Sequence, residues 1–327
     1  MSKSLSVIVP CFNEEEVINE TYKRLKSVLA DLEYQTEIIF INDGSTDNTE
    51  HLLSEFIKTD DTIKIISFSR NFGHQKAVTA GLNNCTSDMA VIIDADLQDP
   101  PEVIPDMIRT MMEANAQVVY CVRKSRKGEG IFKKLSAKAF YRLLNFFSEV
   151  RLPVDTGDFR LIDKSIIREF NHMHEKGKYI RGLVSWIGFK QVPFYYEREA
   201  RFAGETKYPF SKMLKLATTS LLYFSTKPLK LASALGFFSV VFSLVLGVWS
   251  VLGKLMGYTH ANSGWTSLFV LIIFFGGVQL LTIGIVGAYI GNLFDEIKNW
   301  PEYIIDKKVN FIDKNVSFET NEDGKTN

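Results

Sequence analysis

Short apolar runs alternate with amphipathic segments along the N-terminal part of the chain. The runs are rich in Val and Ile and predict five strands, at residues 5–9, 37–41, 63–68, 89–93 and 117–122. Between them, apolar residues recur at helical spacing, and Ser45-Thr46-Asp47 and Pro100-Pro101 are typical helix starts. This alternation predicts an α/β fold with a mostly parallel sheet and helices on both faces.

Two stretches near the C-terminus, residues 231–253 and 265–294, contain no charged side chain. Each exceeds the ~20 residues that a helix needs to cross a hydrocarbon core about 30 Å thick. One such run also fits a buried helix of a globular protein, but two in tandem favour a membrane. The sequence therefore predicts a soluble domain followed by a two-helix transmembrane hairpin.

Lysines flank both outer ends of the predicted hairpin, whereas its connecting segment offers Lys254 and a histidine. The flanking residues are Lys212, Lys215, Lys227, Lys230, Lys298, Lys307 and Lys308. Positive flanks remain on the cytoplasmic side, so the α/β domain and both ends of the hairpin are expected in the cytosol.

Two basic amphipathic segments, residues 131–147 and 211–225, suit a membrane surface that carries anionic lipids. Packing against the sheet is an equal alternative for the first, whereas the second directly precedes the hairpin. The expected organisation is a cytosolic domain (1–210), a juxtamembrane interfacial helix (211–228), two transmembrane helices (229–295) and a cytosolic C-terminal tail (296–327). Gly287 and Gly291 form a Gly-x-x-x-Gly pair that permits close helix contact in a homo-oligomer. A chance pair in a glycine-rich span accounts for it equally well.

Composition and missing motifs exclude several classes of function. The 38 Lys and Arg balance 38 Asp and Glu, so no global basic field is available to attract nucleic acid. Cys11, Cys85 and Cys121 are scattered and odd in number, which indicates packing residues in a reducing compartment. The histidines lack zinc-ligand spacing, no Gly-x-Gly-x-x-Gly follows the first strand, and no Gly-Lys-Ser/Thr loop occurs. Zinc, dinucleotide redox and P-loop chemistry are therefore poor interpretations.

Polar side chains follow four of the predicted strands at the point where each strand ends. They lie at residues 11–14, 42–45, 70–74 and 94–99. In open α/β sheets, ligands bind beyond the carboxyl ends of the strands. We therefore expect the functional site at this edge of the sheet.

The Asp-x-Asp (DxD) motif of Asp94 and Asp96 is the sharpest feature of that edge. Residues two apart in an extended segment face the same side, so both carboxylates can meet one ion. Hard oxygen ligands favour Mg²⁺ or Mn²⁺, and the metal would bridge a nucleotide diphosphate. Asp43, at a neighbouring strand end, is expected to accept hydrogen bonds from a uracil or a ribose. The alternative is an N-cap for the following helix, which Ser45 or Asp47 would supply equally well.

Several motifs together resemble a known family. Val-Ile-Val-Pro-Cys-Phe-Asn-Glu (7–14), Asn-Asp-Gly-Ser-Thr-Asp (42–47) and Asp-Ala-Asp-Leu-Gln-Asp-Pro-Pro (94–101) resemble the family 2 glycosyltransferases of GT-A (Rossmann-like) fold. Asp-Thr-Gly-Asp-Phe-Arg-Leu (155–161) and Ala-Gly-Glu-Thr-Lys-Tyr-Pro (203–209), followed by two spans, look like the polyprenyl-phosphate branch. Bactoprenol glucosyltransferases are the most similar group, and dolichyl-phosphate mannose synthases are more distant. The Gln-x-x-Arg-Trp motif of processive synthases is absent, which favours a single transfer.

The resemblance implies a role for each matching residue. The nucleotide pocket would be lined by Pro10, Phe12, Glu14 and Asp43. The metal and the sugar diphosphate would be held by Asp94 and Asp96, with Gln98 close to them. The acceptor phosphate would meet Arg123, Arg201 and Lys207, although Lys207 would equally suit a lipid headgroup. Asp155 and Asp158 would lie near the reaction centre, in an order that the resemblance leaves open.

The implied reaction is the inverting transfer of glucose from UDP-glucose to undecaprenyl phosphate at the cytosolic face of the bacterial cytoplasmic membrane. Other donors on the same lipid, carrying GlcNAc, mannose, galactose or an aminopentose, are alternatives. A flippase and a second transferase are expected as partners. A non-catalytic membrane scaffold and a nucleotidyltransferase are alternatives of other classes. The scaffold is disfavoured because the metal carboxylates are present, and the nucleotidyltransferase because it has no need of a lipid-handling hairpin.

Overall fold

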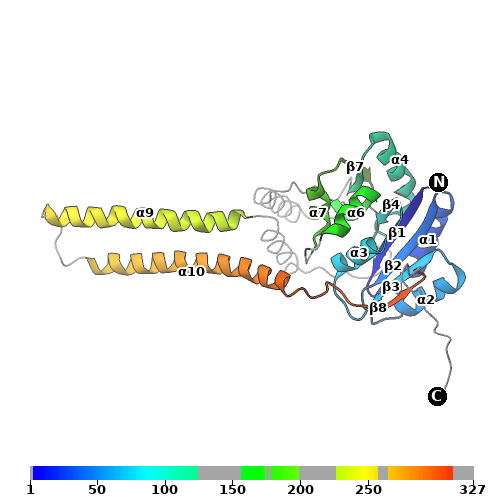
Figure 1. Ribbon diagram of the computed structural model, residues 1–327, viewed down its shortest axis with the longest axis horizontal. Helices are drawn as coiled ribbons and strands as arrows, with labels where there is room; N and C mark the ends of the chain where they lie inside the picture. Colours follow the sequence, from blue (N-terminus) through cyan, green and yellow to red (C-terminus); the bar gives the residue numbers. More distant parts are fainter. Residues whose placement is uncertain are drawn as a thin grey trace, which may run out of the picture.

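The computed structural model describes residues 3–123, 156–173, 175, 178–198, 226–256 and 264–311. They form an α/β domain and two long helices that run side by side away from it (Figure 1). The two amphipathic segments at 131–147 and 211–225 lie outside the described residues, as do Asp155, Arg201 and Lys207.

The described strands form one sheet of order β7-β5-β6-β4-β1-β2-β3-β8. Its strands are β1 (Ser4–Cys11), β2 (Gln35–Asn42), β3 (Ile63–Phe68), β4 (Met89–Ile92), β5 (Val118–Arg123), β6 (Thr156–Asp163), β7 (Gln191–Tyr196) and β8 (Ile305–Val309). The strands β1 to β4 run parallel to one another, β6 lies antiparallel between β4 and β5, and β7 pairs parallel with β5. The predicted mostly parallel sheet is therefore confirmed.

Helices cover both faces of the sheet, as the alternating pattern predicted. One face carries α1 (Ile18–Ala30), α2 (Thr49–Thr59) and α4 (Ile104–Ala114), which follows the short 3₁₀ helix η1 (Pro101–Val103). The other face carries α3 (His74–Asn83), α6 (Lys164–His172) and α7 (Ile180–Ile187).

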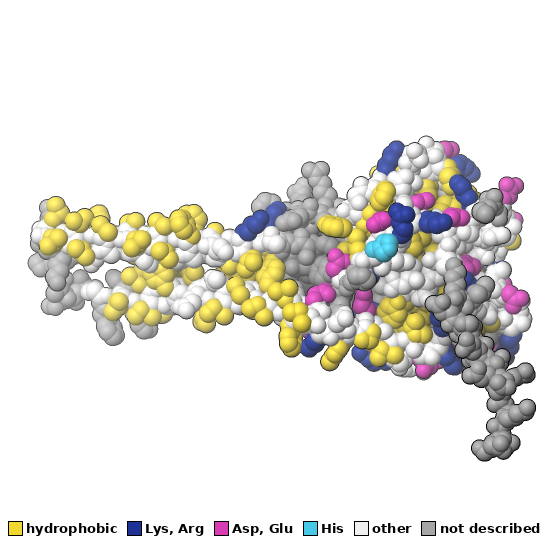
Figure 2. Space-filling view, in the orientation of Figure 1, with side chains coloured by type: hydrophobic (Ala, Val, Ile, Leu, Met, Phe, Trp, Pro, Cys, Tyr) yellow, Lys and Arg dark blue, Asp and Glu magenta, His cyan; other side chains and the backbone are white. Residues whose placement is uncertain are grey.

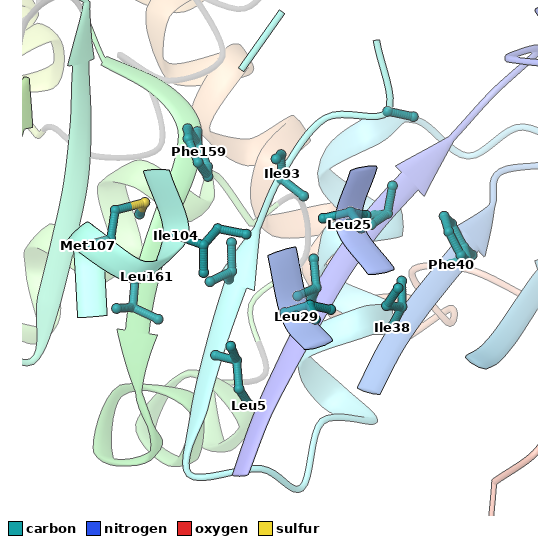
Figure 3. Close-up of a cluster of buried hydrophobic side chains, with 14 of the residues drawn as sticks. Leu5, Leu25, Leu29, Ile38, Phe40, Ile93, Ile104, Met107, Phe159 and Leu161 are labelled. Carbon is teal, nitrogen blue, oxygen red and sulfur yellow. The ribbon is translucent and has the colours of Figure 1, made fainter. Parts of the chain in front are cut away.

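The core on the first face lies between the sheet and the apolar sides of α1 and α4 (Figure 3). Leu25 of α1 and Ile38 of β2 are fully buried there, as are Ile104 of α4 and Leu161 of β6. Burial of each such side chain stabilises the fold by about 1.5–3 kcal/mol. The three cysteines are also buried and free, which confirms their role as packing residues.

The predicted hairpin corresponds to α9 (Lys227–Leu255) and α10 (Gly264–Ile297). Both helices are long and apolar enough to cross a membrane, with a mean hydropathy of 2.3 over Lys227–Gly253 and Val270–Ile297. Only 6% and 0% of the residues in their most apolar stretches are buried, so neither is a core helix. Hydrophobic side chains cover both helices, whereas charged side chains gather on the α/β domain (Figure 2).

The strand β8 follows α10 and brings the chain back to the sheet, where it pairs antiparallel with β3. The apolar pattern did not indicate this strand, because its sequence Ile-Asp-Lys-Lys-Val is short and exposed. Nor did it indicate β6, because that strand buries the charged side chains of Asp158 and Arg160.

Candidate active site

Loops that follow the parallel strands meet at one edge of the sheet. Residues 11–14 follow β1, Asp43 follows β2, residues 70–74 follow β3 and residues 94–99 follow β4. The strand β6 runs in the opposite direction, so residues 156–158 at its start lie at the same edge. This edge is where an open α/β sheet binds its ligands.

Asp43 fixes the loop after β3. Its Oδ1 accepts the Phe72 N–H at 2.6 Å, its Oδ2 accepts the Gly73 N–H at 2.9 Å, and its side chain is buried. Burial raises the pKa of Asp43, although the two backbone donors and the charges of His74 and Lys76 act in the opposite direction. Both carboxylate oxygens are thus engaged within the protein. A contact of Asp43 with the base or ribose stays a prediction.

The loops after β1 and β2 are tied to each other. The Asn13 N–H donates to Ser45 Oγ at 3.0 Å. At the start of α2, the Thr49 N–H is accepted by Asp47 at 3.0 Å. The Asp43 carboxylate accepts from Phe72 and Gly73 instead, so Asp43 does not cap α2. The other residues predicted for the nucleotide pocket lie on β1 and this loop, with Pro10 buried and Phe12 and Glu14 half-buried.

The turn after the DxD motif is built on a buried leucine. Leu97 has a φ of 56° and is 2% exposed, so a residue that rarely adopts the left-handed conformation is held there by packing. The following Gln98 N–H donates to Asp96 Oδ1 at 3.1 Å. This bond ties the backbone of Gln98 to Asp96, and a contact of the Gln98 side chain with the metal or the diphosphate stays a prediction.

Asp94 and Asp96 fit a divalent cation. Asp94 Oδ1 is buried and has no hydrogen-bond partner among the described residues. Burial and the nearby charges of Asp158 and Asp99 outweigh the effect of His74 and raise the pKa of Asp94 to about 6. An orphaned carboxylate oxygen among other carboxylates suits Mg²⁺ or Mn²⁺. Within the described part of the chain no cluster of three or more ligands forms a complete cage, so phosphate oxygens and water would supply the rest.

Asp158 joins β6 to two helices across the site. Its Oδ1 accepts from Arg181 Nε of α7 at 2.7 Å, and its Oδ2 lies 3.1 Å from both His74 Nε2 and Gln75 Nε2 at the start of α3. Gln75 Oε1 in turn accepts the Ile180 N–H at 3.1 Å. His74 Nε2 also lies 3.7 Å from Asp94 Oδ1. The structure therefore connects Asp158 to Asp94 through His74.

The charges of this cluster hold Asp158 ionised. Burial alone would raise its pKa, but Arg181 and His74 keep the pKa of Asp158 well below its usual range. Burial also opposes protonation of His74, yet Asp94 and Asp158 outweigh it and raise the pKa of His74 to about 9. A carboxylate so firmly paired with cations is a poor proton acceptor.

Arg123 lies at the end of β5, further along the same edge. A Cβ added to Gly157 would come within 3.1 Å of Arg123 Nη2. The guanidinium of Arg123 therefore packs against the backbone of β6 at a position without a side chain. Of the predicted phosphate-binding residues, Arg123 is the one that the structure describes. Arg201 and Lys207, like Asp155, stay predictions because they lie outside the described residues.

Sequence reasoning did not single out Gln75 or Arg181, and it noted His74 only as part of the loop after the third strand. One signal was available, since α3 begins at this edge and its first-turn side chains must lie there. No comparable signal existed for Arg181, because α7 follows no predicted strand.

Known proteins are similar to this chain in sequence over most of its length. Residues 6–170 match the model of glycosyl transferase family 2. The chain is 48% identical over 302 residues to the uncharacterized glycosyltransferase YkcC of Bacillus subtilis, covering 92% of this chain and 93% of that protein. It is 38% identical over 303 residues to the SfII prophage-derived bactoprenol glucosyl transferase of Shigella flexneri, covering 93% and 97%.

A solved structure is also similar. Glucosyl-3-phosphoglycerate synthase from Mycobacterium tuberculosis, in complex with Mn²⁺, UDP-glucose and phosphoglyceric acid, superposes with a TM-score of 0.46 at 20% identity, covering 67% of this chain and 78% of that one. The family model and the sequence relatives carry the assignment, since the model spans half of the chain and the relatives nearly all of it. The chain that builds this polar sheet edge is therefore a glycosyltransferase and belongs to glycosyl transferase family 2.

Proposed function

We propose that the protein transfers one glucose from UDP-glucose to undecaprenyl phosphate. One observation carries this proposal: the same sheet edge has carboxylates after β4 and an arginine at the end of β5, on a chain that continues into two membrane-length apolar helices. The carboxylates suit a metal-bound diphosphate, and the arginine suits a phosphate monoester. Relatives named bactoprenol glucosyl transferases support both the lipid and the sugar.

The acceptor decides how much catalysis the protein must supply. A phosphate monoester has a second pKa near 6, so it is already largely dianionic at neutral pH. It needs no strong general base, which agrees with an Asp158 that is ionised and held by Arg181 and His74. Catalysis is then chiefly positioning and charge neutralisation. A single displacement at the anomeric carbon inverts its configuration.

The donor half of the site would hold a divalent cation. Asp94 and Asp96 would bind Mg²⁺ or Mn²⁺, which neutralises the leaving diphosphate. Pro10, Phe12, Glu14, Asp43 and Gln98 would line the nucleotide-sugar pocket.

The acceptor half would bind the lipid phosphate through Arg123, with Arg201 and Lys207 closing over the two anions. Asp155 would lie near the sugar beside Asp158. The catalytic domain, residues 1–210, would lie in the cytosol and the hairpin in the bacterial cytoplasmic membrane as a multi-pass anchor. A homo-oligomer, a flippase and a second transferase complete the proposed setting.

The test incubates the purified full-length protein with Mg²⁺, undecaprenyl phosphate and a panel of UDP- and GDP-sugars, and identifies lipid products by mass spectrometry. We expect one dominant hexosyl phospholipid, from UDP-glucose. Asp96→Ala should lose this product, whereas Asp106→Ala, at an exposed position of α4, should keep it. A product from another sugar would replace the donor and keep the acceptor. No lipid product from any donor, with a folded protein, would overturn the proposal in favour of a scaffold.

A further inference from the structure

Asp99 lies in the same loop as Asp94 and Asp96, and its side chain contacts the end of β7. Its side chain is 0% exposed. Tyr196, the last residue of β7, donates its phenol hydroxyl to Asp99 Oδ1. Burial of a carboxylate costs free energy unless the group is paired and hydrogen-bonded, so an aspartate at this buried position indicates a role beyond packing. Packing alone would be met at lower cost by an apolar residue.

The Tyr196 hydroxyl links Asp99 to Arg123. It donates to Asp99 and accepts a hydrogen bond from the Arg123 guanidinium. Arg123 and Tyr196 are paired in register on the neighbouring strands β5 and β7. Burial and the charge of Asp99 raise the pKa of Tyr196, so the phenol remains protonated at neutral pH. The Tyr196 ring packs edge-on against Phe159 of β6, with centroids 5.8 Å apart, and this fixes the hydroxyl in space.

Arg198 adds a second cation to this cluster. It follows β7, and its Nε lies 3.5 Å from Asp99 Oδ1, at ion-pair distance but without hydrogen-bond geometry. The buried Nε atoms of Arg123 and Arg198 both lack a hydrogen-bond partner among the described residues, as does Asp99 Oδ2. With two guanidinium groups, one carboxylate and a neutral phenol, the cluster carries a net positive charge.

Such a cluster is suited to an anion that has several acceptor oxygens. Buried N–H groups without acceptors cost free energy that a ligand recovers on binding. A phosphate monoester offers three oxygens and up to two negative charges, and guanidinium groups bind it in a fixed geometry. One carboxylate beside the two arginines helps to hold them in position and leaves the cluster with a net positive charge.

We propose that Asp99 and Tyr196 are positioning residues that hold Arg123 and Arg198 as a two-arginine site for the phosphate monoester of the acceptor. This rests on the proposed function and extends it, because it assigns Arg198 to the acceptor and gives Asp99 and Tyr196 a role. The loop of residues 94–99 then serves both substrates, with Asp94 and Asp96 at the donor and Asp99 behind the acceptor.

Steady-state kinetics on the full-length protein test the proposal. Tyr196→Phe keeps the ring and removes only the hydroxyl. We expect it to raise the KM for undecaprenyl phosphate about tenfold, the effect of one lost hydrogen bond to a charged group, and to leave the KM for the sugar donor within about twofold. Asp99→Asn should show the same split. Tyr195→Phe, at an adjacent position that is 56% exposed, is the matched control and should match the wild type.

A binding measurement separates this proposal from the proposed function. Labelled geranylgeranyl phosphate, with geranylgeraniol as the uncharged comparison, is titrated into the detergent-solubilised protein without any donor. We expect the phosphate to bind the wild type, and to bind Tyr196→Phe and Arg198→Gln about tenfold more weakly. If the wild type transfers no sugar but shows this pattern, the proposed reaction fails and the phosphate site stands.

Three outcomes would overturn the inference. The first is unchanged binding of geranylgeranyl phosphate in Tyr196→Phe and Arg198→Gln. The second is an equal rise of the donor and acceptor KM values, which a general structural defect would produce. The third is equal binding of geranylgeraniol and its phosphate. If Asp99→Asn fails to fold, Tyr196→Phe decides alone, after its melting temperature has been compared with that of the wild type.

Discussion

Asp158 is a buried carboxylate that cationic side chains surround, and its charge offsets part of theirs. Its side chain is 9% exposed, with Arg181 Nε at 2.7 Å, His74 Nε2 at 3.1 Å and Arg160 Nη2 at 4.0 Å. Removal of one partner from a buried ion cluster leaves the others without a counter-charge in a medium of low dielectric. We therefore expect Asp158→Asn to lower the free energy of unfolding by about 3–5 kcal/mol at neutral pH.

Denaturant unfolding of the purified protein in detergent would measure this loss. The control is Asp106→Asn, which removes an exposed ion pair with Arg109 and should change stability by less than about 1 kcal/mol. If the two substitutions change the free energy of unfolding equally, Asp158 does not stabilise the fold as the counter-charge of the surrounding cations.

Some residues of the candidate site could be predicted from the sequence and others could not. The place of Asp94 and Asp96 at the sheet edge was predictable because two carboxylates directly follow an apolar run, whereas their binding of a metal stays a prediction. Arg181 and Tyr196 were not predictable, because their place beside Asp158 and Arg123 depends on the pairing of β6 and β7 with the earlier strands. Strand pairing of that kind joins distant residues and leaves no local pattern.

At the scale of elements, the loops after β2 and β3 meet so closely that one position admits only glycine. Gly44 has a φ of +64°, and a Cβ there would come within 2.3 Å of the Arg70 carbonyl carbon. Gly44→Ala therefore combines a strained backbone with a backbone clash. We expect it to shift the loop that Asp43 holds and to weaken UDP binding at least about tenfold, measured by calorimetry.

Gly188 gives a matched control for this substitution. It also has a left-handed φ, +82°, but among the described residues a Cβ there would meet only the Trp186 carbonyl oxygen, at 3.7 Å. Gly188→Ala should cost about 1 kcal/mol of stability and leave UDP binding unchanged. Loss of UDP binding in both variants would mean that the contact between the two loops is not the cause.

A second element-scale prediction concerns the turn between α2 and β3. Asp60 accepts hydrogen bonds from Thr62 N at 2.9 Å and Thr62 Oγ1 at 2.6 Å, and it pairs with Lys26 Nζ of α1 at 2.7 Å. Partial burial would raise its pKa, but Lys26 and Thr62 outweigh burial and lower the pKa of Asp60 from 3.8 to about 2. The carboxylate therefore stabilises the fold above pH 3.8, and this contribution is lost as the pH falls from 3.8 towards 2.

Asp60→Asn should accordingly be less stable than the wild type at pH 7, by about 1 kcal/mol because water screens the pair. The difference should shrink as the pH falls below 3.8 and disappear near pH 2. Melting temperatures of both proteins across this range provide the measurement. A difference that persists at the acid end of the range would mean that the carboxylate acts through shape and not through charge.

The elements differ in how much of them the sequence pattern could reveal. Apolar runs bounded by turn residues located β1 to β5, because those strands are largely buried and contain few polar side chains. The pattern failed at β6, where buried polar side chains such as Asp158 and Arg160 interrupt the apolar ones. It also failed at β7 and β8, which lie at the two edges of the described sheet, where β7 is only partly buried and β8 is largely exposed. Burial of apolar side chains produces the apolar runs that predict a strand. A strand that is partly exposed, or that buries polar side chains, lacks such a run and is not predicted.

At the scale of the whole molecule, the chain leaves the α/β domain, forms the hairpin and returns to the same sheet (Figure 1). The return is anchored before β8 begins. The Tyr303 ring stacks on Phe68 of β3 with centroids 4.9 Å apart, and its hydroxyl accepts from Asn83 Nδ2 at 3.0 Å. Glu302 Oε1 lies 3.8 Å from the buried Lys178 Nζ, next to α7. These contacts tie the segment that follows α10 to β3, to the end of α3 and to the residues just before α7.

This return should make the hairpin part of the folded domain and not a flexible tether. Truncation after Trp300 removes β8 and leaves the outer edge of β3 and the Phe68 ring uncovered. We expect a loss of about 3–5 kcal/mol, from one aromatic ring and several ladder hydrogen bonds, which corresponds to a fall in melting temperature of about 10 °C. Truncation after Phe311 keeps β8, and the resulting protein should have the same melting temperature as the full-length protein.

The point variants Tyr303→Ala and Tyr303→Phe separate packing from hydrogen bonding at the same anchor. The first removes the ring and should account for much of the loss, about 2–3 kcal/mol for a ring that is not fully buried. The second removes only the hydrogen bond with Asn83 and should cost about 1 kcal/mol. If the truncation after Trp300 and the variant Tyr303→Ala both have the melting temperature of the wild type, β8 and the residues before it do not stabilise the domain.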